Sequence, residues 1–121
     1  MASVTIAVIG VFLLAMGAYA LVAPAALAAP FNLTARTPEA RSEIRAVYGG
    51  FGVAMAAVLG LAALDVGDIR TGAVTTVGLA LIGMAAGRLV SRLFDRAVRL
   101  YPIWLYFGIE LVAGAALLLC A

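Results

Sequence analysis

The sequence predicts an all-α integral membrane protein, an antiparallel bundle of four transmembrane helices that occupies residues 1–121 as a single domain. Of the 121 residues, 66% are hydrophobic and only 12% are charged, which is far more apolar than a soluble domain. A bilayer core about 30 Å thick requires roughly 20 apolar residues per helix, and four such stretches follow one another along the chain. They leave no room for a soluble domain.

The first predicted span covers residues 3–22. An alanine-rich segment bracketed by Pro24 and Pro30 follows it, and we expect this segment to lie at the membrane interface. The first 35 residues contain no Arg, so the basic region of a signal peptide is missing. We therefore expect the first helix to be a retained membrane span.

The second predicted span covers residues 38–64 and has a clear start. Thr37 can cap the helix, Pro38 suits its first position, and Glu39 lies in the first turn, where the helix dipole favours an acid. At about 1.5 Å per residue this helix is roughly 40 Å long. Because that exceeds the hydrocarbon thickness, its first two turns should lie at the headgroups.

The third predicted span covers residues 69–99 and also exceeds the bilayer thickness. Its last turns carry charged side chains, namely Arg88, Arg92, Asp95, Arg96 and Arg99. Pro102 ends this helix and opens the fourth predicted span, residues 103–120, because proline cannot continue a helix without a break.

Glycines mark where helices can approach one another in lipid. Gly83 and Gly87 are spaced by four residues in the third span, and Gly49 and Gly50 lie in the second. Small residues at such spacing let backbones come close. Packing within one bundle is favoured over a dimer motif as their role.

The arginines predict the orientation in the membrane. The connections after the first and third spans hold seven of the eight, and the middle turn holds Arg70 alone. By the positive-inside rule those two connections face the cytoplasm, so both termini face outward. Because the arginines lie beside membrane segments, the basic composition does not indicate a nucleic-acid partner.

The absence of certain residues excludes several kinds of chemistry. The chain has no His and no Lys, and Cys120 is its one cysteine. A His-ligated haem, a Cys/His zinc site, a lysine Schiff base and a Ser-His-Asp triad therefore each lack a required residue. We expect no metal and no cofactor, and an enzyme is the least favoured class.

Glu110 is the charged residue that most needs an explanation. It carries the one charge in residues 101–121, and a carboxylate in hydrocarbon must find a cation or a proton. If the last connection pivots near Arg99, Arg88 and Glu110 lie equally far from the pivot and at the same depth. Arg is the best available partner because its guanidinium can fork onto a carboxylate. We therefore predict an Arg88–Glu110 ion pair.

The same depth argument gathers a larger charged cluster. Reflection about the middle turn places Glu43 level with Arg92, and Tyr48 near the level of Arg88. The predicted pocket, in the cytoplasmic half of the bundle, comprises Glu43, Arg45, Tyr48, Arg88, Arg92 and Glu110. The alternative is structural, because arginines near helix ends snorkel to headgroups and an Arg–Glu pair can simply fix helix register.

The block Glu43-Ile44-Arg45-Ala46-Val47-Tyr48-Gly49-Gly50, followed by Gly87-Arg88 and by Arg92 through Asp95, resembles a known family. With the length and the four-span layout, it is similar to the domain of unknown function 4345 family of small bacterial membrane proteins. The resemblance covers nearly the whole chain. It implies a four-helix integral membrane fold, and it places Glu43, Arg45, Tyr48, Gly49, Gly50 and Arg88 in the family's motif. We expect the protein in a bacterial cytoplasmic (inner) membrane. It implies no activity.

Two functions from different classes remain open. In the first, the arginine-rich pocket binds or moves a small anionic or lipid-like ligand. In the second, the protein is a structural or accessory subunit whose charges lock the bundle and whose outer faces contact copies of itself or other membrane proteins. A channel is disfavoured, because four short helices barely surround a pore.

Overall fold

The computed structural model describes residues 1–96, 98 and 100–121, and its regular elements are all helical. In chain order the elements are α1 (Ala2–Val22), α2 (Pro24–Ala28), the 3-10 turn η1 (Ala29–Phe31), α3 (Pro38–Ile44), the π-helical turn η2 (Arg45–Gly50), α4 (Phe51–Ala63), the 3-10 turn η3 (Val66–Asp68), α5 (Arg70–Phe94), the π-helical turn η4 (Leu100–Trp104) and α6 (Leu105–Leu119). The all-α prediction is confirmed.

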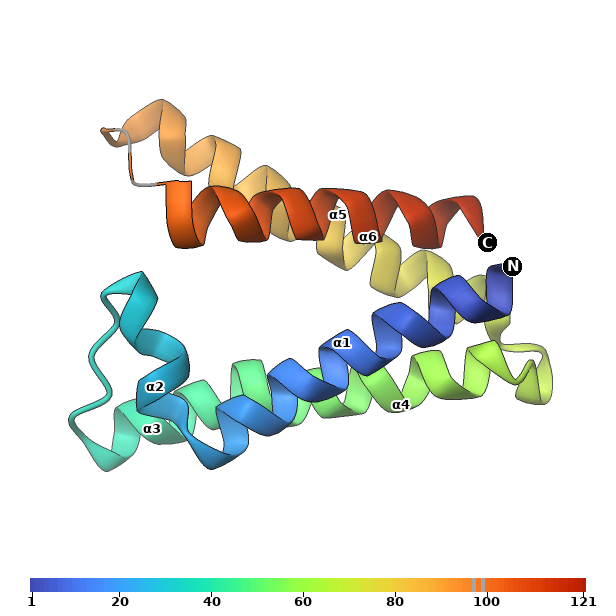
Figure 1. The fold of residues 1–121 in the computed structure, drawn as a ribbon, viewed down its shortest axis with the longest axis horizontal. Helices are drawn as coiled ribbons and strands as arrows, with labels where there is room; N and C mark the ends of the chain where they lie inside the picture. The colour runs from blue at the N-terminus through green and yellow to red at the C-terminus, as the bar shows by residue number, and fades with distance from the viewer. Residues whose placement is uncertain (97, 99) are drawn as a thin grey trace.

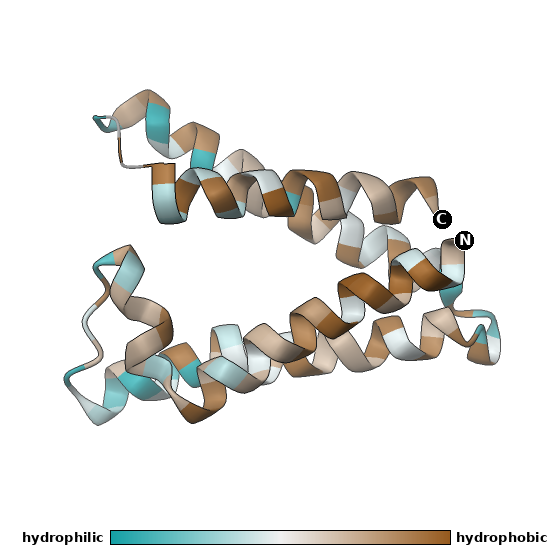
Figure 2. Ribbon diagram, in the orientation of Figure 1, coloured by the Kyte–Doolittle hydropathy of each residue, from teal (hydrophilic) through white to brown (hydrophobic). Residues whose placement is uncertain are grey.

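Four helical segments are long and apolar enough to cross a membrane. They are Ala2–Val22, Pro38–Ala63, Arg70–Phe94 and Leu100–Leu119. Figure 2 shows the apolar residues along the helices and the hydrophilic ones gathered in the connections at the two ends of the molecule, with a further group on α5. This arrangement is that of a multi-pass membrane protein.

The helices form two antiparallel pairs, α1 with α4 and α5 with α6 (Figure 1). The pairs lie close together at the end that holds both termini and the turn between α4 and α5. They spread apart toward the opposite end, where α2 and the connection between α5 and α6 lie. We call these the closed end and the open end.

Glycines bring the two members of each pair together. A Cβ added to Gly17 would lie 2.9 Å from the carbonyl oxygen of Gly49, and one added to Gly49 would lie 2.7 Å from a methyl of Leu21. In the second pair, a Cβ added to Gly114 would lie 2.9 Å from the carbonyl oxygen of Gly78. No side chain larger than hydrogen fits without movement, as is typical of helix packing in lipid.

The structure does not place the other three predicted packing glycines in a helix contact. A Cβ added to Gly83 or Gly87 would meet no described atom within 4 Å, and one added to Gly50 would meet only the carbonyl oxygen of Arg45 in its own turn. The close approach of α5 to α6 lies nearer the closed end, at Gly78 and Gly114.

The limits of the spans differ from the predicted ones mainly at the open end. α5 ends at Phe94, before the predicted limit at residue 99, because Asp95 adopts an extended backbone (φ −120°, ψ 163°). The fourth span is counted from Leu100, but Tyr101 has an extended backbone (φ −98°, ψ 134°), so its helical run begins at Pro102, next to the predicted residue 103. The predicted pivot at Arg99 lies outside the described residues. The second span starts as predicted, since the Thr37 hydroxyl accepts a hydrogen bond of 3.0 Å from the Ala40 N–H.

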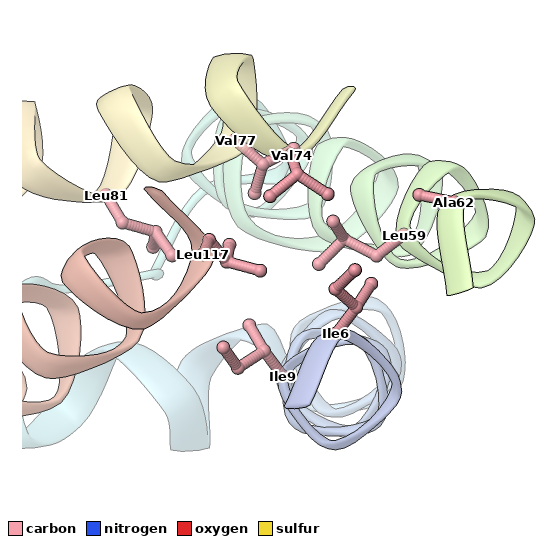
Figure 3. Packing of buried hydrophobic residues seen from close by; sticks show 8 residues of the cluster. All are labelled: Ile6, Ile9, Leu59, Ala62, Val74, Val77, Leu81 and Leu117. Carbon is pink, nitrogen blue, oxygen red and sulfur yellow. The ribbon is translucent and has the colours of Figure 1, made fainter. Parts of the chain in front are cut away.

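The main apolar core lies at the closed end and draws on all four spans (Figure 3). Its members are Ile6, Ile9, Leu59, Ala62, Val74, Val77, Leu81 and Leu117. A smaller cluster at the open end joins Leu27 and Ala28 of α2 to Ala20 of α1 and Ile44 of α3. The two helix pairs are thus joined by close apolar packing chiefly at one end.

Arg70 reinforces the closed end with three hydrogen bonds. Its Nε donates to the carbonyl oxygen of Ala62 at 2.9 Å, and its Nη2 donates to the carbonyl oxygen of Ala63 at 2.9 Å and to the hydroxyl of Ser3 at 2.7 Å. Carbonyls in the last turn of α4 have no partner within their own helix, so an arginine satisfies them well. The side chain ties together the start of α1, the end of α4 and the start of α5.

Candidate functional site

Arg88 of α5 and Glu110 of α6 form a bidentate ion pair. Nε of Arg88 donates to Oε1 of Glu110 at 2.8 Å, and Nη2 donates to Oε2 at 2.9 Å. Glu110 is the one buried charged residue among those described, at 4% exposure, while the Arg88 side chain is 20% exposed. The predicted pair is confirmed, and its forked geometry is the strongest available to these two groups.

Two aromatic rings border the guanidinium. Its Cζ lies 5.8 Å from the ring centre of Phe31 and 6.0 Å from that of Tyr106, and the two rings lie 5.3 Å apart. An arginine close to aromatic rings gains cation–π attraction, which strengthens where water is scarce. Phe31 belongs to η1, so the connection after α1 reaches back to the ion pair across the open end.

An apolar cavity lies beneath the pair, between the two helix pairs. We call it the inner cavity; its volume is about 210 Å³. Side chains of all four spans line it, among them Phe12, Met55, Leu81 and Ile109, and α2 contributes Leu27. The Arg88–Glu110 pair and the hydroxyl-bearing rings of Tyr48 and Tyr106 supply its polar groups.

A second cavity of about 360 Å³ lies on the other side of Arg88, at the open end. We call it the arginine cavity, because Arg88, Arg92 and Arg96 all line it, beside Ser91 and Trp104. Its described lining includes no acidic side chain. Glu110 balances the charge of Arg88, so Arg92 and Arg96 supply the positive potential that attracts an anion to this cavity.

The two cavities share three lining residues, Tyr48, Met84 and Arg88. A molecule that occupied both would place an apolar part between the helix pairs and a polar part among the arginines. Arg88 stands at the boundary. Its Nη1 group has no hydrogen-bond partner among the residues that the structure describes, although guanidinium groups carry five N–H donors.

The structure brings together four of the six predicted site residues. Tyr48, Arg88 and Glu110 line the inner cavity, and Arg92 lines the arginine cavity with Tyr48 and Arg88.

Glu43 and Arg45 line neither cavity. Arg45 donates from Nε to the carbonyl oxygen of Leu21 at 2.9 Å, which ties the end of α1 to η2, and Glu43 is exposed. The predicted alignment of Glu43 with Arg92 assumes parallel, regular helices. The spreading of the pairs and the π-helical turn at Arg45 break that assumption.

The sequence reasoning did not find Phe31 as a site residue. Phe31 lies in a short connection without helical periodicity, and Asn32 next to it adopts a left-handed conformation (φ 58°, ψ 24°) that turns the chain. A single aromatic residue beside a proline carries no signal of a tertiary contact.

The described residues offer no site for a metal ion. No group of three or more His, Cys, Asp or Glu side chains lies together among them. The chemical character of the site comes instead from arginine donors, one buried carboxylate, aromatic rings and an apolar cavity. These groups suit the binding of a molecule with an anionic end and an apolar body.

Comparison with known proteins assigns a family and nothing finer. No match was found among curated proteins or among solved structures. The profile of one family, described as Domain of unknown function (DUF4345), matches residues 1–121, the whole chain. The chain therefore belongs to the domain of unknown function 4345 family.

Proposed function

We propose that this protein binds an anionic amphiphile within the membrane. The apolar part of the ligand occupies the inner cavity, and its carboxylate or phosphate lies in the arginine cavity. The protein then serves to hold or to transfer such a molecule, and Arg88 contacts both parts of it.

The observation that carries the proposal is the position of Arg88. It lines both cavities, it is held in place by two hydrogen bonds to Glu110, and its Nη1 group is free of described partners. Glu110 neutralises the arginine inside the bundle, while the arginine keeps donors for a second anion. A pair with a purely structural role needs no cavity on either side.

Charge supports the placement of the anionic group at the open end. Arg92 makes one long contact, from Nη1 to the backbone carbonyl of Asp95 at 3.5 Å, and so remains available as a donor. Guanidinium groups bind carboxylates and phosphates with two parallel hydrogen bonds. A cluster of guanidinium groups at the end of an apolar cavity therefore favours the binding of an anionic amphiphile over that of a neutral lipid.

The same proposal places the protein in a bacterial cytoplasmic membrane with the open end toward the cytoplasm. The positive-inside rule supports this orientation, since the arginine-rich connections both lie at the open end. The headgroup site then faces the inner leaflet and its anionic lipids.

Thermal unfolding in a non-ionic detergent tests the proposal with two matched probes, oleate and oleyl alcohol. We expect oleate to raise the midpoint of unfolding and oleyl alcohol to have little effect, because only oleate is charged. A ligand at 100 times its Kd stabilises the folded state by about 2.7 kcal/mol.

Two variants and one control make this test specific. Arg88→Gln and Arg96→Gln should each reduce the response to oleate, because both arginines line the arginine cavity. Arg36→Gln should leave it unchanged, because Arg36 is exposed and lines neither cavity. An equal response to both probes, or an equal loss in all three variants, contradicts the proposal.

A further inference from the structure

An open apolar groove runs between α1 and α6 on the outside of the bundle. These two helices lie nearest the viewer in Figure 1. The groove has a volume of about 1030 Å³, and Val4, Val8, Phe12, Leu105 and Val112 are among its lining residues. We call it the lateral groove.

The lining of the lateral groove is suited to hydrocarbon. α1 contributes one hydroxyl to the lining, that of Thr5. This hydroxyl donates a hydrogen bond of 3.1 Å to the backbone carbonyl of Met1, so its donor needs no partner in the groove. Gly108 has no side chain to fill the groove, and a Cβ added there would meet no described atom within 4 Å. The groove is therefore open at this position on α6. Tyr101 and Trp104 line the groove at its open-end limit, and along the rest of the groove an acyl chain would meet apolar side chains.

The lateral groove adjoins the inner cavity. Ile9, Phe12, Ile109 and Ala113 line both of them. Trp104 also lines both the lateral groove and the arginine cavity. The three spaces therefore adjoin one another. Of the three, the lateral groove lies between the exposed faces of α1 and α6.

The packing of the helices explains why this opening exists. Glycine contacts draw α1 onto α4 and α6 onto α5, whereas α1 and α6 belong to different pairs that spread apart toward the open end (Figure 1). Lipid-facing side chains such as those of Val8 and Val112, both well exposed, flank the gap.

The size of the inner cavity restricts what enters it. Its volume of about 210 Å³ exceeds that of an engineered cavity of about 150 Å³ that holds benzene. It is smaller than the roughly 300–1,000 Å³ of pockets for drug-sized ligands. The cavity therefore has room for part of one acyl chain or a single small ring, and a pair of chains is too large for it.

We infer that the lateral groove is the opening through which one acyl chain of an anionic amphiphile passes from the surrounding leaflet into the inner cavity. This inference rests on the proposed function and adds to it the ligand class, a single-chain anion such as a fatty acid, and its source, the bilayer. The anionic group stays at the level of the arginine cavity, beside Trp104, while the chain moves sideways between α1 and α6. The charge therefore never crosses the hydrocarbon.

The test uses the full-length protein in phosphatidylcholine vesicles and a palmitic acid that carries a photoreactive diazirine at the far end of its chain. Irradiation attaches the chain to its neighbours, and mass spectrometry locates the attachments. Excess oleate defines the saturable part. In the unchanged protein we expect saturable attachment at Met55 and Leu81, which line the inner cavity but not the lateral groove.

Two matched variants separate the opening from the binding site. Gly108→Leu fills the lateral groove. Gly60→Leu is the control: a Cβ at Gly60 meets no described atom within 4 Å, and Gly60 lines neither the lateral groove nor either cavity. We expect a several-fold loss of saturable attachment at Met55 and Leu81 in Gly108→Leu and no loss in Gly60→Leu. Equal attachment in both variants overturns the lateral opening and leaves the proposed function intact.

A different result would overturn the proposed function itself. If the unchanged protein shows no saturable attachment inside the bundle, or if Arg88→Gln leaves that attachment unaltered while the protein stays folded, the arginines do not hold the anion. Attachment of a diazirine-bearing palmityl alcohol at the same positions and to the same extent as the acid would likewise contradict recognition of charge.

Discussion

The guanidinium of Arg70 donates a hydrogen bond of 2.7 Å to the hydroxyl of Ser3, and so joins the first turn of the chain to the first turn of α5. The same side chain satisfies the carbonyls of Ala62 and Ala63 at the end of α4. Three helix ends thus meet on one residue, beside the main apolar core.

Replacement of Arg70 should weaken the closed end. Hydrogen bonds to charged groups contribute about 1.5–3 kcal/mol each, and the Arg70→Met variant loses three of them. We expect a clear fall in the midpoint of thermal unfolding in detergent. Ser3→Ala, which removes one partner, should cause a smaller fall. An unchanged midpoint for Arg70→Met would show that Arg70 does not stabilise the fold.

The ion pair predicts a strongly non-additive double mutant. Loss of one partner leaves a buried unpaired charge, which costs about 3–5 kcal/mol, whereas replacement of both by apolar side chains is often nearly neutral. Arg88→Met and Glu110→Leu should therefore each destabilise the protein, and the double variant should be more stable than either. The free energy of unfolding of all four proteins gives the coupling. Additive losses would contradict a direct pair.

The glycines of the α5–α6 pair should differ sharply in their tolerance of alanine. A Cβ at Gly78 would lie 3.2 Å from the carbonyl oxygen of Gly114, and one at Gly114 would lie 2.9 Å from that of Gly78. Overpacking typically costs about 1–3 kcal/mol, so Gly78→Ala and Gly114→Ala should destabilise the α5–α6 pair.

Gly83→Ala is the matched control for these variants. It adds the same methyl group to the same helix, where no described atom lies within 4 Å. It should be neutral or stabilising by up to about 1 kcal/mol, because alanine is the better helix former. Thermal unfolding compares the three variants, and similar losses in all of them would contradict the contact geometry.

The positive-inside rule predicts which compartment each end of the protein faces. In a background in which Cys120 is replaced by Ser, we introduce Ala121→Cys at the closed end or Ser42→Cys at the open end; both positions are exposed. In intact cells a membrane-impermeant maleimide should label the first and spare the second. After permeabilisation both should react. The reverse pattern would place the arginines outside and contradict the proposed headgroup leaflet.

The sequence allowed the ion pair to be predicted because depth in a hairpin depends mainly on distance from the turn. Arg88 and Glu110 lie equally far from the predicted pivot, and an unpaired carboxylate in hydrocarbon is too unfavourable to persist. The Thr37 cap was also predictable, since it depends on neighbouring residues alone. Neither the depth of a residue in a hairpin nor a local helix cap depends on how the helices are rotated about their axes.

The rotation and crossing of the helices could not be predicted from spacing. Gly83 and Gly87 match a packing pattern, yet the contact falls at Gly78 and Gly114, because the face that α5 presents to α6 is set by all of the side chains between them. Glu43 fails to join the cluster because the helix pairs spread apart and the chain forms a π-helical turn at Arg45. The contact of Phe31 with Arg88 depends on a left-handed turn at Asn32 that no periodic pattern marks.

The closed end gives the molecule the geometry of a pair of tweezers. Because Leu59, Val74 and Leu117 are fully buried there and Arg70 fastens the same end, a small change in the angle between the two helix pairs displaces the far tips most. Phe31 of the first pair also contacts Arg88 and Tyr106 of the second, so this contact and the core at the closed end together set the width of the space around Arg88. Substitutions at Leu59, which lines neither cavity, should therefore alter the proposed preference for an anionic amphiphile.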